Sequence, residues 1–211
     1  MATPARSLAE QAYELLEGKL VNLELPPGAQ VSEGQLIEMI GLGRTPVREA
    51  ILKLAQQEMF IVLPRKGLVV TPLSRGSMLH ILEARKPIER VIVYRAALNA
   101  KDDQRSEIAA IARQLSISHE KFDDYLKLDQ ELNTLLDACA ANPFATAAAS
   151  PLRSHCRRFC YGHRHQMQLS EAITACSKMA RLVARRDYVS AQKASDGVLA
   201  VMERYASATG R

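Results

Sequence analysis

The chain has 211 residues and a formal net charge of +5 at pH 7, from 28 Lys and Arg against 23 Asp and Glu. This length gives room for two domains of ordinary size. No apolar stretch resembles a signal-peptide core or a membrane span, which argues against a secreted or membrane protein. In that setting the four cysteines are expected to be reduced thiols, so we expect a cytoplasmic protein.

The positive charge is unevenly distributed along the chain. Residues 1–73 hold seven Lys and Arg against eight Asp and Glu, so the excess of cations lies in residues 74–211. Overall charge therefore does not by itself indicate nucleic-acid binding, and the local clustering of cations has to carry that argument.

The first predicted element is an amphipathic helix over residues 7–22. Ser7 and Glu10 have the spacing of a capping box, in which the two side chains cap the start of a helix reciprocally. A Pro-Pro-Gly run ends this helix. A second capping-box spacing, Ser-Glu-Gly-Gln, predicts a short helix over residues 32–40.

A glycine-flanked turn then leads into a third predicted helix. Gly41 and Gly43 tolerate left-handed backbone angles. Thr45 is the expected N-cap, and Pro46 occupies the first helical position, where its missing N–H costs nothing. Apolar residues recur at helical spacing from there on, so one face of the helix is expected to lie in the core.

Two arginines flank the start of this third helix. Arg44 and Arg48 are expected to project from its N-terminal end, away from the core face. The helix N-terminus also carries partial positive charge, which favours phosphate. Taken alone, each arginine is more often solvated or paired with an acid such as Glu49.

A β-hairpin is predicted next. Two β-rich runs, residues 60–63 and 68–70, are separated by Pro-Arg-Lys-Gly, which places Arg65 and Lys66 at the tip of a turn. Helix, short helix, turn, helix and hairpin in this order predict a winged helix-turn-helix, whose third helix enters the major groove of DNA.

The expected roles of the cations differ. Arg44 and Arg48 have the geometry to pair bidentately with guanine, whereas the wing cations are expected to hold the DNA backbone or enter the minor groove. The candidate DNA-binding residues are therefore Arg44, Thr45, Arg48, Arg65, Lys66 and Gly67.

The segment PPGAQVSEGQLIEMIGLGRTPVREAILKLAQQEMFIVLPRKGLVV resembles the N-terminal domain of GntR-family transcription regulators. The resemblance implies that RTPVREA lies in the recognition helix and that the RKG turn is the wing tip. The chain departs from the family at Gly34, where relatives carry an arginine that touches DNA. That contact is expected to be absent here.

Residues 74–211 are helical in pattern, and the stretch TPLS before them is the expected joint between a DNA-binding domain (1–73) and a second domain (74–211). Six helices are predicted, over residues 74–100, 102–116, 119–140, 142–161, 166–186 and 187–208. An antiparallel bundle is the economical packing for them. The whole chain is therefore expected to be mainly α, with a winged helix-turn-helix followed by an all-α antiparallel bundle.

The second domain also resembles a known form. ILEARKPIERVIVYRAALNA and LDQELNTLLDACAANP resemble helices of the FCD ligand-binding domain in the FadR branch of the GntR family, and six helices suit its VanR-like subgroup. The resemblance implies an effector pocket inside the bundle, a small organic-acid effector, and a homodimer formed through this domain.

Many relatives bind a divalent metal in this pocket through one aspartate and three histidines. Asp129 stands at the aspartate position, whereas Asn133, Cys176 and Val198 stand at the histidine positions. One strong ligand, one weak ligand, one thiol and one hydrocarbon make a poor metal site. We therefore predict a degraded metal site, no cofactor, and direct binding of an organic effector by Arg85, Asp129, Asn133 and Cys176.

Arg85 matches a family arginine that faces this pocket and meets a carboxylate effector. The alternative is an Arg85–Glu89 pair at i,i+4 on the helix surface, which stabilises a helix by about 0.2–0.5 kcal/mol and carries no function. Asp129 has an alternative too, as an exposed helix acid or a structural partner of an arginine.

Three histidines and two cysteines lie between His155 and His165, and four arginines crowd the same stretch: Arg153, Arg157, Arg158 and Arg164. They leave open a soft-metal site or a thiol sensor. A solvated helix end is the expectation we favour, because the neighbouring arginines disfavour a bound cation.

No phosphate-binding glycine loop, nucleophile elbow or hydrolytic metal motif is present, so an enzyme is not expected. Two other classes remain as alternatives: an enzyme of the helical domain with a DNA tether, and an architectural protein that binds any duplex equally. We predict a homodimeric regulator that binds a palindromic double-stranded DNA operator and responds to a small organic acid. The effector, the operator and the direction of regulation stay open.

Overall fold

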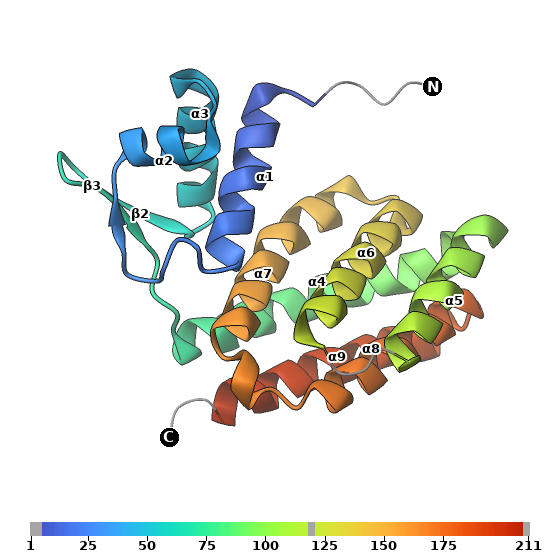
Figure 1. Cartoon of the computed structure of the whole chain (residues 1–211). Helices are drawn as coiled ribbons and strands as arrows, with labels where there is room; N and C mark the ends of the chain where they lie inside the picture. Colours follow the sequence, from blue (N-terminus) through green and yellow to red (C-terminus); the bar gives the residue numbers. More distant parts are fainter. Residues whose placement is uncertain (1–5, 118–120, 209–211) are drawn as a thin grey trace. The chain divides into compact units, whose positions relative to one another are not determined.

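The computed structural model describes residues 6–117 and 121–208, and these are mainly helical (Figure 1). Two compact units divide the chain: Met1–Ser74 with Arg157–Gly162, and Arg75–Cys156 with His163–Arg211. None of the helices in the described ranges has the length and apolar character that a membrane crossing requires.

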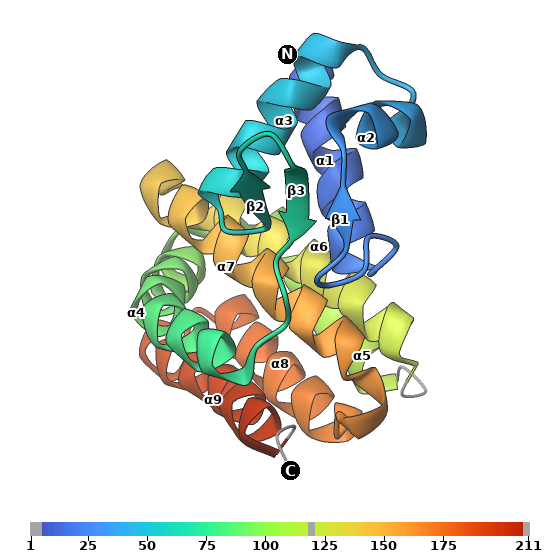
Figure 2. The same cartoon turned by 90° about the vertical axis from the view of Figure 1, so that its left-hand side faces the viewer.

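Over residues 6–74, the first unit contains three helices and a three-stranded sheet. Figure 2 shows the strands beside these helices. Their bounds are α1 (Leu8–Val21), β1 (Gln30–Val31), α2 (Glu33–Ile40), α3 (Arg44–Gln56), β2 (Phe60–Leu63) and β3 (Gly67–Val70). The order matches a winged helix-turn-helix, so this part of the predicted fold class is confirmed.

Local capping explains where these helices begin and end. Both predicted capping boxes form: the Ser7 Oγ accepts from the Glu10 backbone, and Ser32 and Gln35 repeat the arrangement at α2. Gly41 ends α2 in the left-handed conformation, with φ of 68°. A non-glycine residue would be strained in that conformation.

The predicted start of α3 is wrong by two residues. The N-cap is Gly43 rather than Thr45, because the Val47 backbone N–H already donates to the Gly43 carbonyl at 3.3 Å. Thr45 and Pro46 therefore lie inside the first turn, and no side chain caps the start of the helix.

The sheet has the strand order β1-β3-β2, and all pairs are antiparallel. The β2–β3 hairpin forms as predicted, with Leu63 opposite Gly67 at its closed end. Strand β1 was not predicted, because two residues carry no detectable alternation. It places Gln30 opposite Val69, and the Gln30 side chain donates to the Lys66 carbonyl at 2.7 Å.

One hydrophobic core holds this unit together. It joins one face of α1, the inner face of α3 and the hairpin, through Ala12, Leu16, Leu20, Leu36, Val47, Ala50, Ile51, Leu54, Met59, Phe60, Leu68 and Val70. The inner face of α3 is thereby occupied, and its opposite face carries the arginines.

Among the described residues after Ser74, six α-helices follow one another, as predicted. They are α4 (Arg75–Asn99), α5 (Asp102–Ile117), α6 (Phe122–Ala140), α7 (Pro143–Gly162), α8 (Leu169–Ala184) and α9 (Tyr188–Ala208). The last six residues of α7 group with the first unit. The predicted start of the third helix at residue 119 lies outside the described residues. Helix α8 begins later than predicted because a 3-10 turn, η1 (Arg164–Gln166), precedes it.

Within the bundle, α4 packs against α6 and α9, and α8 packs against α5 and α9. Apolar residues of these helices form the core, including Ile92, Val93, Leu115, Leu136 and Met179. Polar side chains near this core are therefore held in an environment with little water, where their pairing matters most.

Candidate nucleic-acid interface and effector pocket

The outer face of α3 presents two arginines to solvent. The Arg44 and Arg48 side chains are 82% and 70% exposed, whereas Val47 between them is fully buried. The expected split between a core face and a cationic face is confirmed. Contact with DNA stays a prediction.

Both arginines lie near one carboxylate. Glu33 at the start of α2 has one oxygen 4.0 Å from Arg44 Nε and the other 3.9 Å from Arg48 Nε. The sequence pointed to Glu49 instead, and it missed Glu33 because the two helices meet only in the folded unit. At such distances, and with side chains this exposed, the ion pairs are weak.

The wing tip is cationic and tightly built. Arg65 and Lys66 are exposed between β2 and β3, and Arg65 itself adopts a positive φ of 63°. Gly67 has a φ of 90°, and a Cβ there would lie 2.8 Å from the Val31 carbonyl oxygen. Gly67 therefore lets β1 and β3 approach closely, a structural role that is separate from its predicted contact with DNA.

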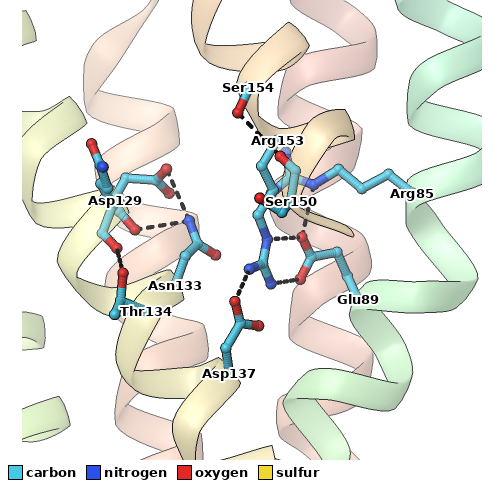
Figure 3. Close-up of polar contacts among 10 residues, drawn as sticks. Arg85, Glu89, Asp129, Asn133, Thr134, Asp137, Ser150, Arg153 and Ser154 are labelled. Atoms are coloured by element: carbon cyan, nitrogen blue, oxygen red, sulfur yellow. Dashed lines mark hydrogen bonds and ion pairs between the residues drawn. The ribbon is translucent and has the colours of Figure 1, made fainter. Parts of the chain in front are cut away.

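The bundle holds a buried ionic cluster, which we call the four-residue network: Arg85 and Glu89 of α4, Asp137 of α6 and Arg153 of α7 (Figure 3). Arg153 meets Glu89 with two parallel hydrogen bonds, of 2.7 and 2.8 Å. Arg85 Nε donates to the same Glu89 carboxylate at 2.8 Å, and Arg153 also donates to Asp137 at 2.7 Å. One carboxylate thus lies between two guanidinium groups.

This pairing shifts the ionisation of the cluster. Burial acts to raise the pKa of Glu89, but the charges and hydrogen bonds of Arg85 and Arg153 outweigh it and lower that pKa to about 2. Burial raises the pKa of Asp137, and the Arg153 guanidinium offsets this only in part. Glu89 is therefore firmly ionised at neutral pH.

Of the two predictions for Arg85, the structure tests only the pairing with Glu89, and contact with an effector stays a prediction. The Arg85–Glu89 pair at i,i+4 forms, but it is buried rather than on the helix surface, with side chains 9% and 6% exposed. The sequence missed Arg153 and Asp137 as its partners, because they come from other helices. The expectation of a solvated helix end over residues 155–165 holds only for its last part: Gly162 and His165 are exposed. The part within α7 is buried, with Arg153 and Arg158 3% and 1% exposed.

The other predicted effector residues lie on α6 and α8. The Asn133 side-chain amide donates to the Asp129 carboxylate at 3.0 Å and to the Asp129 carbonyl at 2.8 Å (Figure 3). Cys176 is buried, and burial raises the pKa of its thiol well above the usual value. Asp129 and Arg85 also act electrostatically on that thiol, so the structure brings Arg85, Asp129 and Cys176 into one neighbourhood.

The residues at the family metal positions do not fit a metal ion. Asp129 is hydrogen-bonded to Asn133, which is a weak ligand, and Cys176 is a thiol that resists deprotonation. Val198 offers no donor atom. In the described ranges, no group of three or more His, Cys, Asp or Glu residues is arranged to hold a metal.

The fold and the cationic face of α3 define a class: a winged helix-turn-helix joined to an all-helical domain. Two family models match the chain, "Bacterial regulatory proteins, gntR family" over residues 8–70 and "FCD domain" over residues 80–201. The second match covers more than half of the chain. The protein belongs to the GntR family of bacterial regulators with an FCD domain.

Proteins of similar sequence are named as transcription regulators. The transcriptional repressor RspR of Escherichia coli K12 is 27% identical over 139 residues, which cover 65% of this chain and 61% of RspR. The transcriptional regulator McbR of the same organism is 29% identical over 117 residues, or 56% of this chain and 53% of McbR. The matched part of the chain thus spans about three fifths or less of these relatives. They are transcription regulators and not enzymes.

Solved structures share the fold. The structure of E. coli McbR has a TM-score of 0.80 at 20% identity, and the match covers 94% of this chain and 98% of that one. A GntR regulator from Rhodococcus sp. RHA1 has a TM-score of 0.73 at 15% identity, with 98% and 100% coverage. The predicted fold class is confirmed.

Proposed function

We propose that this protein is a transcription regulator that binds a palindromic DNA operator as a homodimer, and that a small carboxylate metabolite changes its affinity for that operator. Residues 1–73 act as the DNA-binding domain, and residues 74–211 act as the effector-binding and dimerisation domain. The names of the relatives support the regulatory role, and the surface chemistry of α3 supports the DNA contact.

The exposed pair of arginines at the start of α3 is the observation that carries the DNA-binding role. Arg44 and Arg48 point away from the core. The Glu33 carboxylate that pairs with them lies at 4.0 and 3.9 Å, beyond hydrogen-bond distance. Because no side chain caps α3, the first backbone N–H groups of the helix are available for a phosphate. Base-reading arginines and a phosphate-binding helix start suit sequence-specific binding in a major groove.

An in-vitro selection from a random-sequence duplex library tests this role. We expect enrichment of an inverted repeat, because two copies related by a two-fold axis read two equal half-sites. Enrichment of a single half-site would contradict the dimeric mode. Absence of any enrichment would contradict sequence-specific binding and favour an architectural DNA protein.

The four-residue network is the basis of the effector proposal. Two guanidinium groups, from Arg85 and Arg153, already hold one carboxylate, that of Glu89. Arginine forks suit carboxylates through paired hydrogen bonds. A carboxylate effector therefore competes with Glu89 for these arginines, with Asp129 and Asn133 as further hydrogen-bonding groups.

A rescue experiment tests this proposal. In Glu89→Ala the two arginines lose their carboxylate, so we expect acetate to raise the melting temperature of this variant more than that of the wild type. Sodium chloride at equal ionic strength is the control for salt. Glu131→Ala, at an exposed position of α6, is the matched control variant. Equal effects of acetate on all three proteins would contradict a carboxylate site at Arg85 and Arg153.

We propose further that effector binding needs no metal, since Asn133, Cys176 and Val198 replace the histidines of metal-binding relatives. Elemental analysis of protein purified without chelator tests this. We expect less than stoichiometric zinc, nickel or manganese, and a full equivalent of any of them would contradict the proposal.

A further inference from the structure

A cationic groove lies between α5 and α8 of the helical unit. It measures about 610 Å³, and it is lined by Asp102, Arg105, Ser106, Ala109, Arg113, Arg181, Ala184 and Arg185. Four arginines against one aspartate give it a formal excess of three positive charges. The remaining lining residues are small, so the groove stays open between the cations.

One of the four arginines already has structural partners. Arg105 Nε donates to the Ala184 carbonyl at 2.8 Å, and another of its guanidinium nitrogens donates to Asp102 at 2.8 Å. Arg105 thereby satisfies a carbonyl at the C-terminal end of α8, where a helix favours a cation. The Ala184 carbonyl therefore has its hydrogen-bond donor without any of the other three arginines.

The other three arginines are available to a ligand. Over the residues that the structure describes, the side chains of Arg113, Arg181 and Arg185 form no hydrogen bond or ion pair, and all three are exposed. Asp102 does not neutralise them, since it pairs with Arg105 and lies 4.0 Å from Arg186.

The spacing of the arginines sets the kind of ligand. Arg105, Ala109 and Arg113 are four residues apart, so they lie on one face of α5, and the two arginines are about 12 Å apart along the axis. Arg181 in the last turn of α8 and Arg185 at its C-cap are likewise four residues apart, and α8 packs against α5. A single small anion cannot reach all of these guanidinium groups, whereas a ligand with several anionic groups can.

We infer that the groove between α5 and α8 binds a small polyanion, a ligand that carries two or more phosphate or carboxylate groups. The guanidinium fork pairs with phosphate or carboxylate through two parallel hydrogen bonds, which suits both chemistries. This site lies on the outside of the bundle, and it is separate from the buried network around Glu89. It does not depend on DNA binding.

Calorimetric titration of the full chain with tripolyphosphate at low salt tests the inference. We expect binding by the wild type, and binding that is at least about tenfold weaker in Arg181→Gln/Arg185→Gln, because each removed guanidinium takes away charge-assisted hydrogen bonds. Lys127→Gln/Lys193→Gln removes the same number of charges from exposed positions of the helical unit outside the groove, and it should bind tripolyphosphate within about twofold of the wild type.

Citrate in place of tripolyphosphate separates the two chemistries, since tighter binding of one anion identifies phosphate or carboxylate as the preferred group. Absence of binding for both anions at millimolar concentration would overturn the inference. A second outcome would also overturn it: Arg181→Gln/Arg185→Gln loses affinity for a random DNA duplex but keeps its affinity for tripolyphosphate. The groove would then bind the DNA backbone. Operator binding through Arg44 and Arg48 is measured with DNA rather than with tripolyphosphate, so the two proposals can fail separately.

Discussion

The start of α3 and the centre of the helical bundle use the same side chain in opposite ways. Arg44 and Arg48 are largely exposed, and their ion-pair partner Glu33 lies about 4 Å away. Arg85 and Arg153 are almost fully buried, and they share the Glu89 carboxylate at hydrogen-bond distance. Exposure, rather than residue type, decides whether an arginine can meet an outside partner directly or, like Arg85 and Arg153, only in competition with a carboxylate of the protein itself.

The energetic consequence follows from solvation. An exposed arginine is hydrated whether or not the protein is folded, so its removal hardly affects the free energy of unfolding. A buried arginine has lost its water and depends on its carboxylates, so its removal leaves charges without compensation. The first region should therefore tolerate substitution and lose function, and the second should lose stability.

The largest expected effect is on stability. Arg153→Ala leaves the Glu89 and Asp137 carboxylates buried with one cation fewer, and we expect the free energy of unfolding to fall by about 3–5 kcal/mol. The matched control is Arg204→Ala, whose ion pair with Glu171 is also 2.7 Å long but lies at the surface. Chemical denaturation should show a loss of about 0–1 kcal/mol for the control. Similar losses in both variants would remove the distinction between the two regions.

The next effect is the pH dependence of the free energy of unfolding that comes from Glu89. Its pKa is about 2 in the folded protein against an ordinary value of 4.5. A lowered carboxyl pKa contributes stability above pH 4.5, and that contribution is lost as the pH falls toward 2. The stability difference between the wild type and Glu89→Gln should therefore be nearly constant above pH 5 and shrink by about 2 kcal/mol between pH 6 and pH 3.

Asp137 has a raised pKa, so its contribution changes with the opposite sign, as protonation of this carboxyl favours the folded state. It is present in both proteins and largely cancels in the difference. Urea denaturation between pH 6 and pH 3 gives the measurement. A difference that does not change with pH would show that the Glu89 carboxylate is not held by its arginines.

A smaller effect concerns the wing. If Arg65 and Lys66 hold the DNA backbone, the variant Arg65→Gln/Lys66→Gln should lower the slope of log affinity against log salt by about 1 for each cation. The selected operator sequence should stay the same, because phosphate contacts carry no base information. A changed half-site with an unchanged slope would instead assign base reading to the wing.

The smallest effect concerns the carboxylate beside the two base-reading candidates. Glu33→Gln removes a negative charge that repels phosphate, so we expect operator affinity to rise by up to about 1 kcal/mol. Glu38→Gln, an exposed position on the same helix, changes the charge equally and serves as the control. An equal gain in operator affinity in both variants would show that the effect comes from overall charge and not from the position of Glu33.

The sequence predicted well what is decided locally. The capping boxes at Ser7 and Ser32, the turn at Gly41 and the hairpin all depend on residues within a few positions of one another. The six helices of the second unit follow from apolar periodicity and their boundary residues. The start of α3 was misplaced because Gly43 accepts the first helical hydrogen bond without any side-chain signal.

The candidate sites were predictable only in part. The exposure of Arg44 and Arg48 follows from the periodicity of α3, but their neighbour Glu33 is brought close only when α2 and α3 pack. The burial of Arg153 was not predictable, because its partners lie 16 and 64 residues away on other helices. Partners that tertiary packing selects leave no trace in local spacing.

The most direct test of the regulatory role compares operator affinity in the wild type and Arg48→Ala at one fixed salt concentration. We expect a loss of about 1–3 kcal/mol in binding, with the free energy of unfolding unchanged within about 0.5 kcal/mol. Arg6→Ala, another exposed arginine of the same unit, should bind the operator as the wild type does. Unchanged affinity in Arg48→Ala would contradict the assignment of α3 as the element that reads DNA.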